Sequence, residues 1–319
     1  MISLDHVREA AQRLDGIVVR TPLLPFRDGV FIKPESLQPT GSFKIRGAYN
    51  ALAQLTDDER ARGVVAHSSG NHGQAIARAA RLLGMRAIVV MPNNAPAVKV
   101  AGVRADGAHI EFVGPHNEER VERAHQIAHD DGLVLVPSAN HENVICGQAT
   151  IGLEIVDDLR ARGEMEPPVV IVPIGLGGLA AGVGLAVTSL SEGASVFGAE
   201  PALAADTHES LERGERVAWP AEHTARTIAD GLRGESPAEI AFVLLKKHLA
   251  GVITVAEEQI VDAMRVAARE ARLVLEPSGA TPLAAYLSHA DGLPTGPVVV
   301  VASGGNVDQA LYANWLAGG

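Results

Sequence analysis

Short runs of apolar, β-branched residues alternate with longer amphipathic stretches along most of this chain. The runs "GVVAHSS" (63–69) and "RAIVVMP" (86–92) are typical of buried strands. The stretch between them, "GQAIARAARLLG" (73–84), has the apolar spacing of a helix. Further alternation continues to residue 138 and begins again after it. Strands and helices that alternate with short links predict a parallel sheet covered by helices.

The second half of the chain repeats this pattern without a repeat of fixed period and without an obvious linker. The predicted strands are 167–175, 195–201, 251–256 and 296–305, and the predicted helices are 147–163, 179–191, 257–273 and 281–292. We therefore predict an α/β fold with two lobes, each a mostly parallel twisted sheet flanked by helices. The large lobe is expected to comprise residues 1–49 and 142–319, and the small lobe residues 50–141.

Composition and charge restrict the class of protein. The 319 residues are 47% hydrophobic and 20% charged, which favours a packed core over disorder. A formal net charge of -11 argues against non-specific nucleic-acid binding and against anionic membrane surfaces. The single cysteine, Cys146, excludes an intrachain disulfide and is expected to be a small core residue. Residues 1–16 look like an amphipathic helix rather than a signal peptide, so we expect a soluble cytoplasmic protein.

Three turns rich in glycine and serine directly follow predicted strands. They are "SSGNHG" (68–73), "GLGGLAAG" (175–182) and "SGGN" (303–306). The carboxyl ends of parallel strands are where such folds bind ligands. The middle turn also opens an alanine-rich helix, so its backbone N–H groups and the helix dipole would suit an anion, most often a phosphate.

The same middle turn permits a second interpretation. Gly175, Gly177 and Ala180 match G-x-G-x-x-G/A, and Glu200 ends the next predicted strand, as in a dinucleotide fingerprint. A nicotinamide-dependent oxidoreductase is therefore an alternative. That alternative gives no function to the other two turns or to Lys44.

Lys44 lies in the stretch "PTGSFKIRGA" (39–48), in what looks like a turn of small residues. A surface lysine at a helix start would be the ordinary explanation. A phosphate site, a lysine and a turn able to bind a carboxylate together indicate pyridoxal phosphate (PLP) acting on an amino acid, because a lysine amine forms the Schiff base with that cofactor. Such a lysine needs to be buried and partly deprotonated.

Four motifs, in order, resemble those of the serine/threonine dehydratase and serine racemase family, which are PLP enzymes of the tryptophan-synthase-β-like fold (fold type II). The motifs are "ESLQPTGSFKIRGA" (35–48), "SSGNHGQ" (68–74), "GLGGL" (175–179) and "SGGNVD" (303–308). The resemblance covers nearly the whole chain. It implies that the large lobe binds PLP and that the small lobe lies on the substrate side.

The resemblance implies a role for each matching residue. Lys44 would form the Schiff base and then act as the base at Cα of the substrate. Phe43 would pack against the cofactor ring, Gly231 would allow close approach on its other side, and Asn71 would bond the 3-hydroxyl. The implied phosphate-binding backbone is Gly175, Leu176, Gly177, Gly178 and Leu179, and the implied partner of the pyridine nitrogen is Ser303.

The implied substrate loop consists of Ser68, Ser69, Gly70, Asn71 and His72. Ser69 matches the residue that acts as acid or base on the face opposite Lys44 in the racemases. His72 is expected to be structural rather than catalytic.

The expected activity is β-elimination of serine, threonine or 3-hydroxyaspartate to a 2-oxo acid and ammonia. Amino-acid racemisation is the alternative main activity, and an amino-acid-binding module without catalysis is a third possibility. In the role that the resemblance implies, Ser303 would offer the ring nitrogen a hydroxyl instead of a carboxylate, and a hydroxyl does not enforce ring protonation, which suits elimination.

The resemblance also implies a metal site. Glu200, Ala204 and Asp206 match the family's cation site, and two carboxylates with a carbonyl suit Mg²⁺, Mn²⁺ or Ca²⁺.

The glycine turn departs from the family's pattern at one position. The family's phosphate loop has four consecutive glycines, whereas here the second position is Leu176. Leucine avoids positive φ, so either this position is not left-handed or the loop differs. A homodimer is the family's expected assembly.

Overall fold

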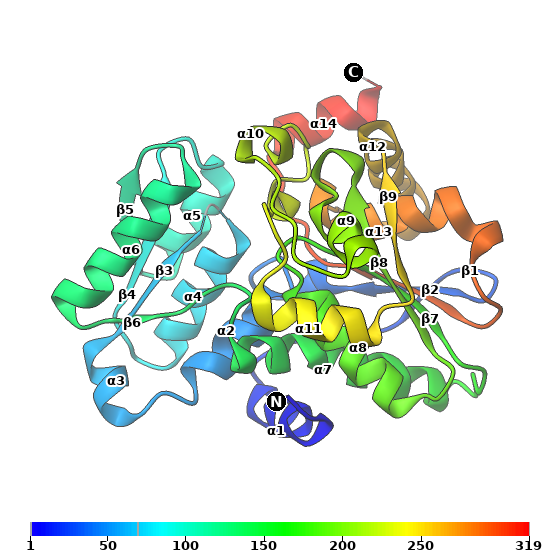
Figure 1. The fold of residues 1–319 in the computed structure, drawn as a ribbon, viewed down its shortest axis with the longest axis horizontal. Coiled ribbons are helices and arrows are strands. Elements are labelled where there is room, and N and C mark those ends of the chain that lie inside the picture. The colour runs from blue at the N-terminus through cyan, green and yellow to red at the C-terminus, as the bar shows by residue number, and fades with distance from the viewer. Residues whose placement is uncertain (1, 69, 319) are drawn as a thin grey trace.

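The chain folds into two α/β parts that lie side by side, each with its own sheet (Figure 1). The structure is a computed structural model, and it describes residues 2–68 and 70–318. One sheet has four strands in the order β5-β4-β3-β6, and the other has six in the order β1-β2-β10-β7-β8-β9. The α/β fold with two lobes that the sequence predicts is confirmed.

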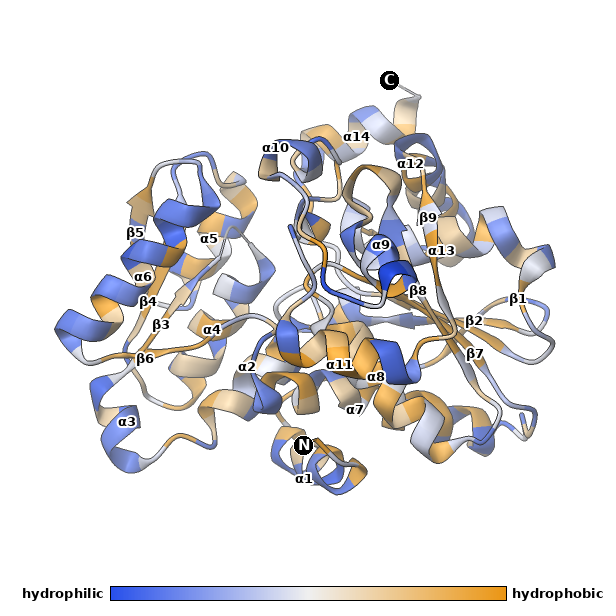
Figure 2. Ribbon diagram, in the orientation of Figure 1, coloured by the Kyte–Doolittle hydropathy of each residue, from blue (hydrophilic) through white to orange (hydrophobic). Residues whose placement is uncertain are grey.

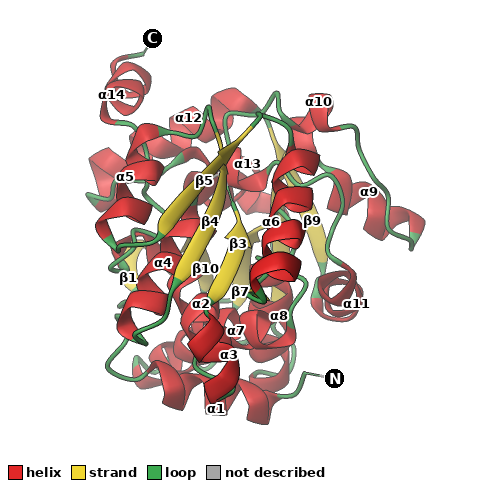
Figure 3. Ribbon diagram, turned by 90° about the vertical axis from the view of Figure 1, so that its left-hand side faces the viewer, coloured by secondary structure: helices red, strands yellow, loops and turns green. Residues whose placement is uncertain are grey.

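The four-stranded sheet is entirely parallel, and helices cover both of its faces (Figure 3). Its strands are β3 (Val64–His67), β4 (Ala87–Pro92), β5 (His109–Val113) and β6 (Val134–Leu135). The helices of this part are α3 (Asp57–Arg62), α4 (Asn71–Leu82), α5 (Ala97–Ala105) and α6 (Asn117–Asp131). Because both faces are covered, β4 is buried at every position, which explains its uninterrupted apolar sequence.

The six-stranded sheet is parallel except for its edge strand β1, which pairs with β2 in antiparallel fashion. Its strands are β1 (Leu24–Arg27), β2 (Val30–Pro34), β7 (Val169–Pro173), β8 (Ser195–Pro201), β9 (Gly251–Val255) and β10 (Val298–Ala302). Strands β2, β7 and β10 are buried throughout. Figure 2 shows that strands β7, β8 and β9 of this sheet are largely apolar, as are α8 and α11 beside them.

The remaining α-helices of the described structure surround the six-stranded sheet. They are α1 (Leu4–Leu14), α2 (Lys44–Leu52), α7 (Glu142–Ala161), α8 (Gly178–Leu190), α9 (Asp206–Arg213), α10 (Ala221–Thr224), α11 (Glu239–His248), α12 (Glu257–Val266), α13 (Pro277–His289) and α14 (Gln309–Ala317). Five short helical segments complete the described structure: η1 (Glu35–Leu37), η2 (Ala202–Ala204), η3 (Asp230–Leu232), η4 (Ala267–Ala271) and η5 (Ala290–Gly292). One apolar cluster includes residues of α7, α8 and α11, and a second includes residues of α12 and α13.

Several predicted boundaries need correction. Lys44 does not lie in a turn but is the first residue of α2. Helix α4 begins at Asn71 rather than at residue 73, and α7 begins at Glu142 rather than at residue 147. The helix predicted over 257–273 changes at Ala267 into the wider π-helical segment η4, and the residue after it, Arg272, has φ 59°.

Within the described residues, no helix combines the length and the apolar character needed to cross a membrane.

Candidate active site

Lys44 is held at the end of strand β10 by its neighbours in the chain. The N–H of Phe43 donates a 3.0 Å hydrogen bond to the carbonyl of Ser303, and Ser42 forms a β-bridge with Gly304. The start of α2 therefore lies against the "SGGN" turn that follows β10. These two motifs, which are far apart in the sequence, are in direct contact.

The Lys44 amine lies in an unusual environment. The residue is half-buried, and among the described residues its amine has no hydrogen-bond partner. Its Nζ atom is 5.0 Å from the centre of the Phe43 ring. Burial lowers the pKa of Lys44 from 10.5 to about 8, although the carboxylate of Glu276 opposes this shift. Part of the amine is therefore uncharged near neutral pH, as a nucleophile or base requires.

The chain's other lysines are engaged or exposed. The Lys33 amine is 2.6 Å from Glu154 Oε2, and the Lys99 amine is 2.5 Å from Asp230 Oδ2. Lys246 donates to the backbone carbonyl of Gly214, and Lys247 is exposed. Lys44 is thus the lysine best suited to react with an aldehyde.

The glycine turn after β7 has the shape of an anion site. Gly177 takes the left-handed conformation, with φ 88°, directly before the first residue of α8. Among the described residues, Arg272 is the one non-glycine residue with positive φ, so Leu176 is not left-handed. The leucine is therefore compatible with this turn, because the left-handed position falls on the following glycine.

Within the part of the chain that the structure describes, the backbone N–H groups of this turn have no protein acceptor. Among the described residues, none from Gly175 to Ala180 donates to a protein acceptor, and α8 has no side-chain cap. A row of free donors at the start of a helix is a ready binding site for a phosphate. The phosphate of PLP fits this chemistry.

Gly231 lies directly beside the glycine turn. A Cβ atom on Gly175 would be 2.9 Å from the carbonyl oxygen of Gly231, so this approach needs glycine. The N–H of Gly231 donates a 2.9 Å hydrogen bond to Ser278 Oγ, in the first turn of α13. At the residue before α13, Glu276, the N–H donates to the carbonyl of Gly304. A chain of contacts therefore joins the glycine turn to the "SGGN" turn.

Asn71 comes from the four-stranded part and completes this cluster. Its Nδ2 donates to Glu276 Oε1 at 2.5 Å, and its Oδ1 accepts from Asn306 Nδ2 at 2.9 Å. Glu276 and Asn306 are not among the site residues that the sequence predicts. Asn306 is part of the quoted "SGGN" turn, and Glu276 is an acidic residue between an apolar residue and a proline, so both carried a usable signal.

Lys99 forms a second bridge between the two parts. Its amine contacts Asp230 Oδ2 at 2.5 Å and Glu276 Oε2 at 3.2 Å. The lysine is buried and its stem passes over Gly70, where a Cβ atom would be 2.7 Å from Lys99 Cδ. Burial raises the pKa of Glu276 despite the lysine. Lys99 and Asp230 are not predicted as site residues, because nothing in the local sequence links α5 to η3.

The predicted substrate loop lies at the start of α4. Ser68 Oγ accepts a 3.1 Å hydrogen bond from the N–H of Gly70. His72 is buried, its Nε2 is hydrogen-bonded to the carbonyl of Val136, and burial lowers its pKa to about 3. This histidine is therefore neutral at physiological pH. Ser69 lies outside the described residues.

Cys146 is buried in the first half of α7, and burial raises the pKa of its thiol to about 11. A thiol of this kind is a poor nucleophile.

The predicted cation-binding residues lie together after β8. Glu200 accepts hydrogen bonds from the N–H groups of Thr207 and His208, at the start of α9. Both carboxylate oxygens of Asp206 are buried, and neither has a hydrogen-bond partner among the described residues. Burial, together with the charge of Asp206, raises the pKa of Glu200. Two adjacent buried carboxylates without a neutralising partner fit a divalent cation.

Within the described residues, no cluster of three or more His, Cys, Asp or Glu side chains is arranged to hold a metal. The third predicted ligand, the carbonyl of Ala204, belongs to a different class of donor.

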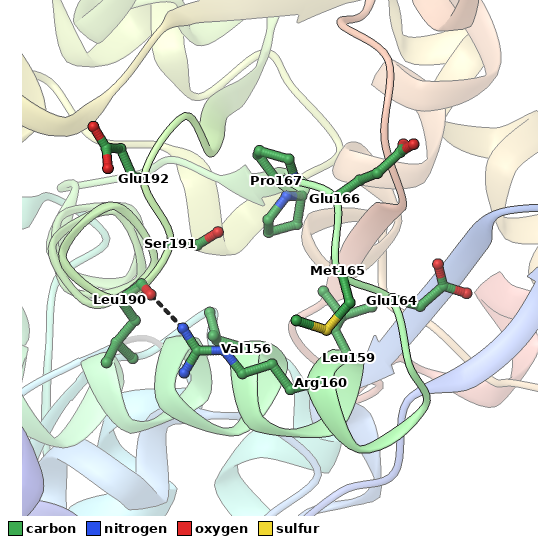
Figure 4. Close-up of a pocket in the computed structure, with 11 residues that line it drawn as sticks. Val156, Leu159, Arg160, Glu164, Met165, Glu166, Pro167, Leu190, Ser191 and Glu192 are labelled. Carbon is green, nitrogen blue, oxygen red and sulfur yellow. Dashed lines mark hydrogen bonds between the residues drawn. The ribbon is translucent and has the colours of Figure 1, made fainter.

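A cavity of about 230 Å³ lies elsewhere, between the C-terminal ends of α7 and α8 (Figure 4). Arg160 bridges it by donating to the carbonyl of Leu190. None of the predicted site residues that the structure describes lines this cavity.

Comparison with known proteins identifies the class to which this fold and cluster belong. Residues 14–304 match the family described as pyridoxal-phosphate dependent enzymes, and the chain belongs to that family. An L-threo-3-hydroxyaspartate ammonia-lyase from Saccharomyces cerevisiae is 36% identical, over 98% of this chain and 95% of that protein. An L-threonine ammonia-lyase from Thermotoga maritima is 40% identical, over 97% of this chain and 76% of that protein. The solved structure of maize serine racemase has a TM-score of 0.91 and 35% identity, over 99% of this chain and 97% of that one.

The family decides between the two cofactors that the glycine turn allowed. PLP is the cofactor, and the nicotinamide alternative is wrong. The predicted resemblance to the dehydratase and racemase family is confirmed.

Proposed function

We propose that this protein catalyses the PLP-dependent β-elimination of small β-hydroxy amino acids, giving a 2-oxo acid and ammonia. The observation that carries the proposal is the cluster at the ends of β7 and β10. There, the start of α2, with its half-buried Lys44 amine, contacts the "SGGN" turn, and a row of free N–H groups lies at the start of α8. Similarity to ammonia-lyases for 3-hydroxyaspartate and threonine supports the substrate class.

The residues would divide the work as follows. When bound, PLP supplies an electron sink for the amino acid joined to it. The N–H groups from Gly175 to Leu179 would bind the phosphate, with Phe43 and Gly231 on the two faces of the ring. Ser303 would accept or donate a hydrogen bond at the ring nitrogen without enforcing its protonation. Lys44 would take the proton from Cα while the β-hydroxyl leaves.

Asn71 would orient the ring through its remaining amide hydrogen, because Glu276 and Asn306 hold the rest of its amide. The loop of Ser68, Gly70 and His72, with Ser69, would bind the substrate carboxylate mainly through backbone N–H and hydroxyl groups. The assignment of residues 50–141 to a substrate-side domain is part of this proposal.

Racemisation is the second candidate activity, because the chain is also similar to serine racemases. In that case Ser69 would move the Cα proton on the face opposite Lys44.

The proposal includes a metal site and an assembly. A divalent cation would bind at Glu200, Ala204 and Asp206, and the protein would form a homodimer. Light scattering of the purified protein would measure the oligomeric state.

The test of function uses PLP-loaded protein with L-serine, L-threonine and L-threo-3-hydroxyaspartate, and measures 2-oxo acid, ammonia and D-isomer together. We expect elimination of at least one substrate, and a Lys44→Ala variant should lose about 10²–10⁴-fold of the rate because its base is gone. Lys247→Ala, at an exposed lysine, is the matched control and should keep the rate. An unchanged elimination rate in Lys44→Ala would refute the proposal.

A further inference from the structure

A buried ion network lies beneath the first turn of α2. Arg46 is completely buried, and its guanidinium binds two carboxylates at once. Its Nε and Nη2 donate to the two oxygens of Glu35, both at 2.8 Å. Its Nη1 and Nη2 donate to the two oxygens of Glu154 at 2.6 and 2.9 Å. Bidentate pairs of this kind fix the orientation of the guanidinium as well as its position.

The network is balanced in charge and in hydrogen bonds. Lys33, also completely buried, donates to Glu154 and to the carbonyl of Thr21. Glu35 accepts two further hydrogen bonds, from Thr21 Oγ1 at 2.7 Å and from Gln38 Nε2 at 3.0 Å. The two cations and two carboxylates therefore neutralise one another. Lys33 Nζ is also 3.7 Å from Asp158 Oδ2, and Asp158 pairs with Arg20 at the partly exposed edge of the network.

These residues connect segments that are distant in sequence. Lys33 lies on β2, Glu35 on η1, Arg46 on α2 and Glu154 on α7. Helix α2 packs against α7 of the six-stranded part and also against α4 of the four-stranded part (Figure 1). A helix in contact with both parts needs a fixed attachment to one of them if its first residue is to stay in place.

Arg46 supplies that attachment two residues after Lys44. Burying ion pairs is costly, and well-packed apolar residues often stabilise a protein as well or better. A guanidinium held on both sides sets a unique orientation that apolar side chains would not enforce. Burial of Lys44, opposed by Glu276, accounts for the shifted pKa of the lysine. The neutral network would therefore act through position rather than through charge.

We propose that Arg46, held by Glu35 and Glu154, is a positioning residue that fixes the first turn of α2 on the six-stranded part and thereby places the Lys44 amine for reaction. This inference rests on the proposed function of Lys44. It gives a task to a charged cluster that the phosphate site, the substrate loop and the cation site leave unexplained.

The test removes one positive and one negative charge together. Arg46→Met/Glu35→Leu leaves the Lys33–Glu154 pair intact, so no charge is left unpaired. The matched control is Arg27→Met/Glu270→Leu, which removes a 3.0 Å ion pair between β1 and η4 at the protein's surface. Both proteins are loaded with PLP and compared with the wild type in thermal unfolding, in circular dichroism of the bound cofactor's visible band, and in kcat and KM.

We expect the Arg46→Met/Glu35→Leu protein to unfold cooperatively and to bind PLP, but with weaker dichroism and with kcat lowered by at least about tenfold, because a small displacement of a reacting group is costly. The KM should change less, since the backbone N–H and hydroxyl groups proposed to bind the substrate carboxylate are untouched. The control should match the wild type in every measurement. Unchanged dichroism and kcat per bound cofactor would overturn the proposal.

A second variant covers failure of the first to fold. Arg46→Lys keeps the positive charge but cannot form the paired hydrogen bonds of a guanidinium to each carboxylate. It should therefore lower the dichroism and kcat, as the double variant does. Wild-type values for Arg46→Lys would also overturn the proposal. In cofactor-free protein, the Lys44 amine of either variant should titrate closer to an ordinary lysine. That measurement and the dichroism need no elimination activity, so a wild type without such activity would refute the proposed function and leave this test valid.

Discussion

Asn71 Nδ2 donates a 2.5 Å hydrogen bond to Glu276 Oε1, and this bond joins the first residue of α4 to the residue that precedes α13. The same carboxylate is 3.2 Å from the Lys99 amine and raises the pKa of Lys44 electrostatically. Glu276 therefore links the two α/β parts and influences the proposed reactive amine.

Replacing Glu276 by Gln should shift the Lys44 titration downwards. The carboxylate favours the charged ammonium, so removing its charge should lower the pKa of Lys44 below its value of about 8. The measurement is a ¹³C NMR titration of the reductively methylated, cofactor-free protein, with the Lys44 signal assigned from a Lys44→Ala sample. Because Lys99 keeps Asp230, we expect a loss of stability of only roughly 1–3 kcal/mol.

Glu258→Gln, at an exposed position on α12, is the control for that titration and should leave the Lys44 signal unchanged. A Lys44 pKa that stays the same or rises in Glu276→Gln would contradict the electrostatic link.

The glycine turn allows a paired substitution at neighbouring positions. Gly177→Ala should destabilise the protein by about 1–3 kcal/mol, because a side chain is strained at positive φ. The new Cβ would also lie 2.8 Å from Leu245 Cδ1. Distortion of the N–H row should weaken PLP binding. The measurements are thermal unfolding and a spectroscopic titration with PLP.

Leu176→Gly is the counterpart of Gly177→Ala, because it restores the glycine that the family's loop carries. Leu176 is 40% exposed and is not left-handed, so the substitution should leave PLP affinity unchanged. Because glycine gives the unfolded chain more conformational entropy, the substitution should lower the free energy of unfolding by about 0.4–1 kcal/mol. Equal effects of the two substitutions on PLP affinity would refute the role given to the backbone of this turn.

The parallel strands could be predicted from sequence because their apolar runs are complete. Strand β7 reads "VVIVP" and is buried at all five positions, so local composition alone indicates a covered parallel strand. The ligand-binding role of the glycine turn after β7 could also be predicted from the sequence, because such folds bind ligands at the carboxyl ends of their parallel strands.

The start of α2 could not be predicted in the same way. Pro39 and Gly41 precede Lys44 and made the segment look like a turn, whereas the helix is held by contacts outside it. The interactions of Arg46 with Glu154 join residues 108 positions apart. A charged residue in a strand or helix looks exposed in sequence until its buried partner is known, and for that reason Lys33, Glu35 and Arg46 were missed as core residues.

His72 should make the stability of the protein sensitive to acid. Its pKa in the folded state is lowered to about 3 from 6.5, so the unfolded chain binds a proton that the folded protein rejects. The contribution of His72 to the free energy of unfolding is therefore fully present above pH 6.5 and is lost as the pH falls from 6.5 towards 3. By linkage the loss amounts to roughly 3–5 kcal/mol. Urea unfolding at several pH values measures it.

His72→Asn should be less stable than the wild type at pH 7 and should lose less stability between pH 6.5 and 4. His129→Gln, at an exposed histidine of α6, serves as the control and should keep the wild-type dependence. If the free energy of unfolding of His72→Asn falls with pH as steeply as that of the wild type, other groups cause the acid sensitivity.

The paired carboxylates of Glu200 and Asp206 predict stabilisation by a divalent cation. A cation that binds only the folded protein raises its stability by about 2.7 kcal/mol at one hundred times its dissociation constant. We therefore expect Mg²⁺, Mn²⁺ or Ca²⁺ to raise the melting temperature of protein that has been treated with a chelator. Asp206→Asn should lose this increase, because one of the two buried carboxylates is gone, whereas Asp291→Asn, at an exposed position, should retain it. If none of the three ions changes the melting temperature, the carboxylate pair does not bind a cation. In that case Asp206 is a buried acid that is partly protonated near neutral pH, in line with its pKa, which burial raises to about 7.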